Sequence, residues 1–160
     1  MARTELKGDG LDKRKIVEQY AQAFQTRDIE MSGTLMHPEI VARYPQSGET
    51  IRGRDNYLAT LAAYPLGLPN TDVSSVKGGD KAAVVPSSLP FARPTVTVFG
   101  GDQYVIEGVA TYPDGAFFHV VLVLRLRDGK VFEETSYFAA PFDPPEWRQD
   151  FVELDEPRED

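Results

Sequence analysis

One feature constrains the fold more than any other: near Thr71 the hydrophobic pattern changes from helical spacing to the alternation of β-strands. Before that point, apolar residues recur every three or four positions, as at Ile16, Tyr20 and Phe24, which is typical of an amphipathic helix. After it, strand-like runs are separated by short turns that contain glycine and aspartate. Helices followed by a long antiparallel meander predict an α+β domain, with the helices packed on one face of a bent sheet.

Three helices are expected in the first part of the chain. The first ends near residues 26–27, and Asp28 is well placed to N-cap a second, short helix. His37-Pro38 is expected to end that helix, because a proline pushes the preceding residue out of the helical region. The third helix is expected at Gly53–Tyr64, and a last short helix at Glu146–Glu153, after a proline-rich turn.

The expected strands are joined by hairpin turns. Gly100-Gly101-Asp102, Pro113-Asp114-Gly115 and Asp128-Gly129 contain residues that accept the positive φ these turns require. The stretch Gly78–Pro94 is interpreted as an irregular insertion in which only Ala82–Val85 has the pattern of a strand. The other predicted strands are Glu39–Tyr44, Glu49–Arg52, Asp72–Lys77, Thr95–Phe99, Gln103–Tyr112, Ala116–Arg127 and Lys130–Phe138.

The sequence is interpreted as one domain, residues 13–153, between a flexible N-terminal segment (1–12) and an acidic tail (154–160). A strand as long as Ala116–Arg127 is expected to coil, because sheets twist. A coiled sheet that is closed on one side by helices encloses a cone-shaped interior. Such an interior is a natural pocket for a small apolar molecule.

Composition excludes several kinds of site. The net charge of −8 gives nucleic-acid binding no electrostatic support. Cysteine is absent and only two histidines, His37 and His119, are present, so neither a metal site nor a cofactor is expected. No run approaches the roughly 20 apolar residues of a membrane span, and the first residues lack the apolar stretch of a signal peptide. We therefore expect a cytoplasmic protein with neither a membrane nor a nucleic acid as partner.

Three segments of the chain are distinctive: IVEQYAQAFQTRDIE, LMHPEIVARYPQSGETIRGRDNYL and RLRDGKVFEETSYFAAPFDPPEWR. In order and spacing, over residues 15–150, they resemble SnoaL-like proteins of the nuclear-transport-factor-two-like superfamily, which have a cystatin-like α+β barrel. That superfamily includes ketosteroid isomerase, scytalone dehydratase, limonene epoxide hydrolase, polyketide cyclases and plain binding proteins. The resemblance implies a cone-shaped barrel with N-terminal helices in the concave face of a curved, mostly antiparallel sheet, commonly a homodimer through the outer face. It does not imply one reaction, because this fold hosts several chemistries.

Enzymes of this superfamily typically use one carboxylate or histidine inside the apolar cone, where burial raises the pKa of a carboxyl toward working pH. The catalytic candidates are His119, Glu107 and Glu133. SnoaL-type cyclases pair a strand histidine with a later acid, and the resemblance matches these to His119 and Glu133, although the cyclases have aspartate at the second position. Glu107 lies beside Gly108, which would make room for a ligand. The alternatives are a hydrogen-bonded or dimer-face histidine and a solvent-facing glutamate.

The register of the last hairpin decides whether His119 and Glu133 can act together. A two-residue turn at Asp128-Gly129 puts His119 and Glu133 on opposite faces of the sheet. A three-residue hairpin, with Gly129 in a G1 bulge, puts His119, Glu133 and Tyr137 on one face. We favour the bulge.

Four aromatic residues are predicted to bind substrate. Tyr44, Tyr112 and Tyr137 are expected to direct their hydroxyls into the cone as donors to a carbonyl or an enolate. Trp147 is expected to cover the end of the cone, because it lies on a short helix after a proline-rich segment. For each of them, packing in an aromatic core is the alternative.

Two hypotheses for the function follow. The first is a cofactor-independent isomerase, cyclase, dehydratase or hydrolase that acts on a small apolar molecule with a pocket acid or base. The alternative is a non-catalytic small-molecule-binding or dimerisation module. A homodimer is expected in either case, because two neighbouring strands are apolar on both faces, at Phe118, Val120, Leu122, Leu124, Phe132 and Phe138.

Overall fold

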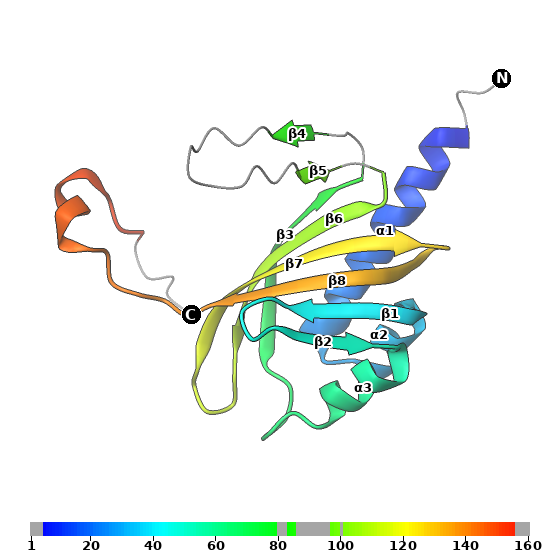
Figure 1. The fold of residues 1–160 in the computed structure, drawn as a ribbon, viewed down its shortest axis with the longest axis horizontal. Helices are drawn as coiled ribbons and strands as arrows, with labels where there is room; N and C mark the ends of the chain where they lie inside the picture. Colours follow the sequence, from blue (N-terminus) through cyan, green and yellow to red (C-terminus); the bar gives the residue numbers. More distant parts are fainter. Residues whose placement is uncertain (1–4, 80–82, 86–96, 100, 156–160) are drawn as a thin grey trace.

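The computed structural model describes residues 5–79, 83–85, 97–99 and 101–155 (Figure 1). The helices are α1 (Glu5–Thr26), α2 (Ile29–Leu35), α3 (Arg54–Ala62) and the 3₁₀-helix η1 (Glu146–Phe151). The strands are β1 (Met36–Tyr44), β2 (Glu49–Arg52), β3 (Asn70–Gly78), β4 (Ala83–Val85), β5 (Thr97–Phe99), β6 (Gln103–Thr111), β7 (Phe117–Arg127) and β8 (Lys130–Ala139). In this described part of the chain, no helix combines the length and the apolar character needed to cross a membrane.

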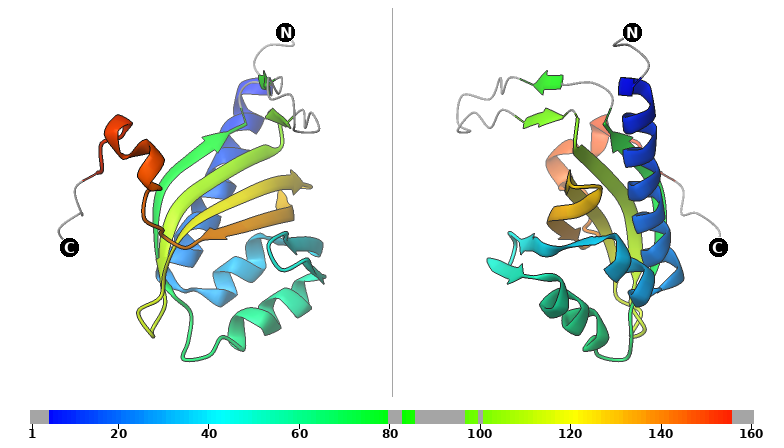
Figure 2. Two further views of the ribbon diagram at one scale, coloured as in Figure 1. Left: turned by 60° about the vertical axis from the view of Figure 1, so that its left-hand side comes forward. Right: turned by 90° about the vertical axis from the view of Figure 1, so that its right-hand side faces the viewer.

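Six strands form one sheet in the order β2-β1-β8-β7-β6-β3, while β4 and β5 pair separately. Neighbouring strands of the large sheet are antiparallel, except that β1 and β8 run parallel. The sheet is open, with β2 and β3 at its edges, and it curves around the helices (Figures 1 and 2). The predicted α+β architecture, with N-terminal helices in the concave face of a curved and mostly antiparallel sheet, is confirmed.

Strand β7 shows how the sheet divides inside from outside. Its even-numbered residues from Val120 to Leu126 are buried and face the helices across the concave side. Its odd-numbered residues, from Phe117 to Arg127, point to the opposite side, which we call the outer face. The core lies between the concave face and α1, where Val17 and Tyr20 are fully buried.

The last hairpin has a different register from the predicted one. Arg127 pairs with Lys130, so Asp128-Gly129 is a two-residue turn, and both turn residues have the positive φ of a type I′ turn. The predicted bulge at Gly129 is therefore wrong. A bulge nevertheless occurs further along β8, because Arg125 pairs with Glu133 whereas Leu126 pairs with Val131, which leaves Phe132 as the extra residue.

The bulge at Phe132 restores the predicted sharing of a face. In the register after the bulge, His119 lies opposite Ala139 and Val121 opposite Tyr137. Because side chains alternate along a strand, His119, Glu133 and Tyr137 all share one face of the sheet. That face is the outer one.

Two element boundaries differ from expectation. Helix α1 begins at Glu5, within the segment that is predicted to be flexible. The helix includes Gly8 and Gly10, despite the cost of glycine in a helix. Helix α2 ends at Leu35, and the following Met36 is already extended and fully buried in the core, so Pro38 lies inside β1 and does not end the helix.

Several other predictions are confirmed. Asp28 caps α2, since its carboxylate accepts a hydrogen bond from the Met31 backbone N–H at 2.8 Å. The strands predicted at Ala82–Val85 and Thr95–Phe99 appear as β4 and β5. Residues 82, 95 and 96, and most of the predicted insertion Gly78–Pro94, lie outside the described residues. The C-terminal helix is a short 3₁₀-helix that ends at Phe151.

Candidate functional site

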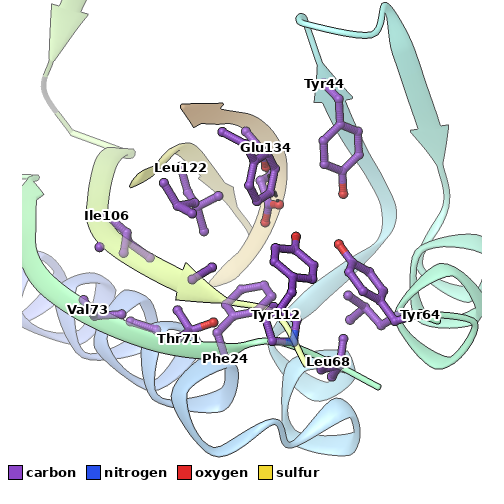
Figure 3. A pocket seen from close by; sticks show the side chains of 18 of the residues that line it. Phe24, Tyr44, Tyr64, Leu68, Thr71, Val73, Ile106, Tyr112, Leu122 and Glu134 are labelled. Atoms are coloured by element: carbon purple, nitrogen blue, oxygen red, sulfur yellow. Dashed lines mark hydrogen bonds between the residues drawn. The ribbon is translucent and has the colours of Figure 1, made fainter. Parts of the chain in front are cut away.

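A cavity lies inside the cone, between the concave face of the sheet and helices α1 and α3 (Figure 3). Its volume is about 70 Å³, and its lining is mainly aliphatic and aromatic. Among the titratable side chains of this lining, Glu134 carries the only carboxyl; the others are tyrosines. The residues that line it are Ala21, Phe24, Tyr44, Tyr57, Leu61, Tyr64, Leu68, Pro69, Thr71, Val73, Ile106, Gly108, Ala110, Tyr112, Val120, Leu122, Glu134, Ser136 and Phe138.

The carboxyl of Glu134 is held by three hydroxyl groups. Its side chain is only 1% exposed. Tyr20 donates a hydrogen bond to Oε2 at 2.7 Å, and Tyr57 donates one to Oε1 at 2.5 Å. Ser136, two residues along the same strand, donates a third to Oε1 at 2.9 Å. A carboxylate has about four acceptor positions, so one position on Oε2 remains for another donor.

Burial decides the acidity of this group. Removal from water raises the pKa of Glu134 above its ordinary value, because the charged form loses its hydration. The hydrogen bonds from Tyr57, Tyr20 and Ser136 act in the opposite direction and only partly offset that effect. Burial and the nearby carboxyl also hold the pKa of Tyr20 and Tyr57 well above the ordinary value, so both hydroxyls stay protonated and remain donors.

Three separate elements bring these groups together. Glu134 faces the concave side because it pairs with Leu124, a buried residue of β7. Tyr20 lies on the buried stripe of α1, one turn before Phe24, which its ring meets edge-on. Tyr57 lies in the first turn of α3 and is also buried. The polar group at the centre of the cavity therefore links the first helix, the third helix and the last strand.

The mouth of the cavity is a row of aromatic rings. Tyr64 stacks on Tyr112, and Tyr44 stacks on Phe138, with ring centroids 6.1 and 6.2 Å apart. Phe118 joins the two pairs by edge-on contacts with Tyr112 and with Phe138. We call these five rings the aromatic collar. The hydroxyl of Tyr44 points into the cavity (Figure 3).

A wider basin of about 600 Å³ opens outside the collar. Tyr44, Tyr64, Tyr112 and Phe138 line both this basin and the inner cavity, so the collar separates the two. A molecule longer than the inner cavity would therefore extend through the collar into the basin.

Burial is the main reason that the pKa values of Tyr44 and Tyr112 are raised above the ordinary value, and the Glu134 carboxyl adds to the effect on Tyr44.

The structure places the three predicted catalytic residues outside the cavity. His119 is exposed on the outer face. Glu133 forms an ion pair with Arg125 at 2.9 Å, also on the outer face. Glu107 accepts hydrogen bonds from Lys77 at 2.5 Å and from Ser75 at 2.6 Å, and the Lys77 contact lowers its pKa most. The catalytic role of these residues stays a prediction, and the structure does not bring them together with the cavity.

Of the four predicted substrate-binding residues, the structure brings two to the cavity. Tyr44 and Tyr112 belong to the aromatic collar. Tyr137 is exposed on the outer face, and Trp147 is 77% exposed on η1, away from the cone. Within the described ranges, no group of three or more histidine, aspartate or glutamate side chains is arranged to hold a metal ion.

Sequence reasoning missed Glu134, Tyr20 and Tyr57. A signal for Glu134 was present in the neighbouring strand. The odd-numbered residues of β7 include His119 and Arg125, whereas the even-numbered ones are uniformly apolar, so the even-numbered set indicates the inner face. The bulge at Phe132 decides which of the adjacent Glu133 and Glu134 lies on that face, and no local sequence pattern predicts this bulge.

Comparisons with known proteins agree with this architecture. The family model described as "SnoaL-like domain" matches residues 17–134. No curated protein sequence matches the chain. Among solved structures, an NTF2-like protein of unknown function from Burkholderia xenovorans is similar at 27% identity and a TM-score of 0.69, over 89% of this chain and 94% of that one.

Two further structures share the fold at lower identity. A candidate ketosteroid isomerase from Kribbella flavida has 21% identity and a TM-score of 0.70, with 92% of each chain covered. An LEH-like epoxide hydrolase from M. tuberculosis has 17% identity and a TM-score of 0.58, over 80% of this chain and 83% of that one.

Proposed function

The chain belongs to the SnoaL-like domain family, and on that basis we propose that it is a cofactor-independent enzyme for a small, largely apolar molecule with one polar oxygen. Glu134 transfers the proton. The observation that carries the proposal is a carboxyl with a raised pKa, buried against an apolar cavity and held by three hydroxyl donors. An acid whose pKa is shifted toward working pH can both give and take a proton, as a general acid–base group must.

The arrangement gives each group a separate task. The apolar lining binds the hydrocarbon part of the substrate by removing it from water. Glu134 uses its remaining acceptor position to take a proton from carbon or water, or gives its own proton to an oxygen. Tyr20 and Tyr57 stabilise the ionised carboxylate, because hydrogen bonds to the charged form favour it. Tyr44, with its hydroxyl in the cavity, donates to the substrate oxygen.

Two structural neighbours support this class of reaction. One is named as a candidate ketosteroid isomerase and the other as an epoxide hydrolase. A ketosteroid carries a carbonyl oxygen and an epoxide carries an ether oxygen, and each is otherwise mostly hydrocarbon. An isomerase, cyclase, dehydratase or hydrolase would all use the same proton transfer to or from such a molecule.

A non-catalytic binding protein is the second candidate function. The observation that favours it is the small inner cavity, about 70 Å³, together with a carboxyl that already has three donors. In that case Glu134 links α1, α3 and β8 and has no chemical step to perform. Ligand binding without turnover would support this second function.

The proposal includes a homodimer as the functional form. Phe117 and Tyr137 are large apolar side chains left exposed on the outer face, beside the half-buried Val121 and Val123. Burying such a face between two copies removes apolar surface from water. Sedimentation velocity is expected to show a dimer at micromolar concentration, and a monomer would contradict this part of the proposal.

The test compares two adjacent glutamates. Wild type, Glu134→Gln and Glu133→Gln are assayed with unsaturated cyclic ketones for isomerisation and with alicyclic epoxides for hydrolysis. Loss of the buried acid is expected to lower turnover about 100-fold or more, whereas the same change at Glu133, outside the cavity, leaves turnover within about twofold. Equal loss in both variants, or turnover that survives Glu134→Gln, would overturn the role of Glu134. Binding of a ketone or epoxide without turnover in wild type would favour the binding function.

A further inference from the structure

The chain after β8 leaves the domain as an arm. Residues 140–155, which include η1, project away from the end of the sheet (Figures 1 and 2). Four large apolar side chains of this arm are exposed: Phe142 by 78%, Trp147 by 77%, Phe151 by 84% and Leu154 by 73%. Several large apolar residues gathered on one short exposed segment indicate an interaction surface.

Prolines prevent this arm from continuing the last strand. Pro141, Pro144 and Pro145 fix their φ angles and lack the N–H that a β-ladder or a helix would use. The arm therefore neither prolongs β8 nor folds into a longer helix. With about ten extended residues and six in a 3₁₀-helix, it can reach on the order of 40 Å from the sheet.

The charge of the arm defines the surface that it fits. Residues 140–155 contain five carboxylate side chains but one cationic side chain, Arg148. Each of the three exposed aromatic residues of the segment has a carboxylate residue directly beside it in the sequence. A complementary surface must therefore combine an apolar floor with positive charge.

The outer side of this same domain carries such a surface. A groove of about 520 Å³ is lined by Pro38, Glu39, Val41, Arg52, Gly53, Arg127 and Phe132, and we call it the outer groove. The Arg127 guanidinium lies 3.7 Å from the centre of the Phe132 ring and forms an ion pair with Glu39 of the same groove at 2.8 Å. The positive charge that faces solvent at this groove is therefore that of Arg52, which is exposed on the neighbouring edge strand β2. Arginine stacks on aromatic rings and pairs with carboxylates, so the groove suits a segment that carries both.

The arm and the outer groove of one chain lie at opposite ends of β8. The arm starts after Ala139, the last residue of β8, whereas Phe132 lies near the other end of the same strand. In a two-fold dimer whose axis runs across the strands, the two ends of β8 exchange places, so each arm end meets the groove end of the other copy. The two contacts are then equivalent, as a closed dimer requires.

We propose that the C-terminal arm of one chain docks in the outer groove of a second copy, with its aromatic side chains against Phe132 and its carboxylates facing Arg52. The proposal concerns assembly and does not depend on a catalytic role for Glu134. It also differs from association through the outer face alone, because it requires the arm itself to become buried on the partner.

Trp147 is the single tryptophan of the chain, so its fluorescence reports the arm alone. Emission is recorded over a range of protein concentrations, in parallel with sedimentation velocity on the same full-length chain. The emission maximum is expected to move to shorter wavelength as the chain associates, in step with the sedimentation coefficient. Solvent-exposed emission in a sedimenting dimer, or a short-wavelength maximum that does not depend on concentration, would overturn the proposal.

Charge exchange tests the groove. Arg52→Glu is expected to raise the concentration at the midpoint of the fluorescence change about tenfold, because it places a carboxylate opposite the acidic arm. Glu146→Arg added to Arg52→Glu is expected to restore the midpoint. Arg54→Glu, a nearby charge reversal outside the outer groove, serves as the matched control. Equal effects of Arg52→Glu and Arg54→Glu, or no restoration in the double variant, would contradict docking in the outer groove.

Discussion

The hydroxyl of Tyr57, in α3, donates a 2.5 Å hydrogen bond to the carboxyl of Glu134, which lies 77 residues later in β8. Both side chains are buried, and the contact joins the third helix to the centre of the sheet. A polar contact of this kind is costly to bury and costly to break. It also fixes the Glu134 carboxyl, which alone among the described carboxyl groups lines the inner cavity.

Removing the hydroxyl of Tyr57 should therefore change both stability and acidity. Tyr57→Phe leaves Oε1 of Glu134 with the Ser136 donor and is expected to cost about 1–2 kcal/mol in the free energy of unfolding, measured in urea. The loss of a donor to the charged form is expected to raise the pKa of Glu134 further. Tyr137→Phe, on the outer face, is the control and should change the unfolding free energy by less than about 0.5 kcal/mol. Equal stability of both variants would contradict the assigned hydrogen bond.

The buried acid gives stability a predictable dependence on pH. Because burial raises the pKa of Glu134 above 4.5, its contribution to folding is fully present below the pKa of the unfolded chain and is lost as pH rises through the folded pKa. Glu134→Gln does not titrate at this position. The melting temperature of the variant minus that of wild type is therefore expected to increase between about pH 5 and about pH 8. A difference that falls over this range would mean that folding lowers the pKa.

Filling the cavity should block ligand binding without disturbing the acid. Ala110 is buried and lines the cavity, so Ala110→Leu is expected to occupy part of that space and to abolish binding and turnover. Overpacking is expected to cost about 1–3 kcal/mol of stability, which calorimetry measures. Ala139→Leu, at the exposed end of β8, is the control. Unchanged binding by a folded Ala110→Leu protein would place the ligand elsewhere.

Gly108 permits the close approach of two strands. An added Cβ atom would collide with the carbonyl oxygen of Asp72 and lie 3.1 Å from the Cα atom of Val73, at the register shift of β3. Gly108→Ala is expected to destabilise the β3–β6 pair and to lower the unfolding free energy by about 1–3 kcal/mol. Amide hydrogen exchange is expected to rise mainly along β3 and β6. Uniform protection in both strands would show that the sheet accommodates the methyl group.

The order of elements was accessible from the sequence because its signals are local. Helical spacing around Tyr20, the cap at Asp28 and the turn at Asp128-Gly129 each depend on a few neighbouring residues. The cone follows from a long meander that must cover one apolar face. The longer α1 was missed, because glycines at its start hide a helix from periodicity arguments.

The site was less accessible, because it depends on contacts between distant elements. A single extra residue at Phe132 decides that Glu134, and not Glu133, faces the cavity. In the sequence, Tyr20 and Tyr57 have the pattern of ordinary helix-core residues. Only the fold shows that both lie beside the carboxyl of Glu134. The exposed position of Trp147 likewise depends on the direction of the chain after β8, which the local sequence pattern does not specify.

One measurement tests the central claim most directly, namely that the cavity holds a carboxyl suited to proton transfer. In protein with carbon-13-labelled glutamate side chains, the carboxyl resonance of Glu134 is identified by its absence in Glu134→Gln and is followed as pH is raised. We predict that it titrates clearly above the ordinary glutamate value of 4.5. Titration of Glu134 at or below that value would contradict the account, because the group would then be an ordinary carboxylate without the acidity that the proposed reaction requires.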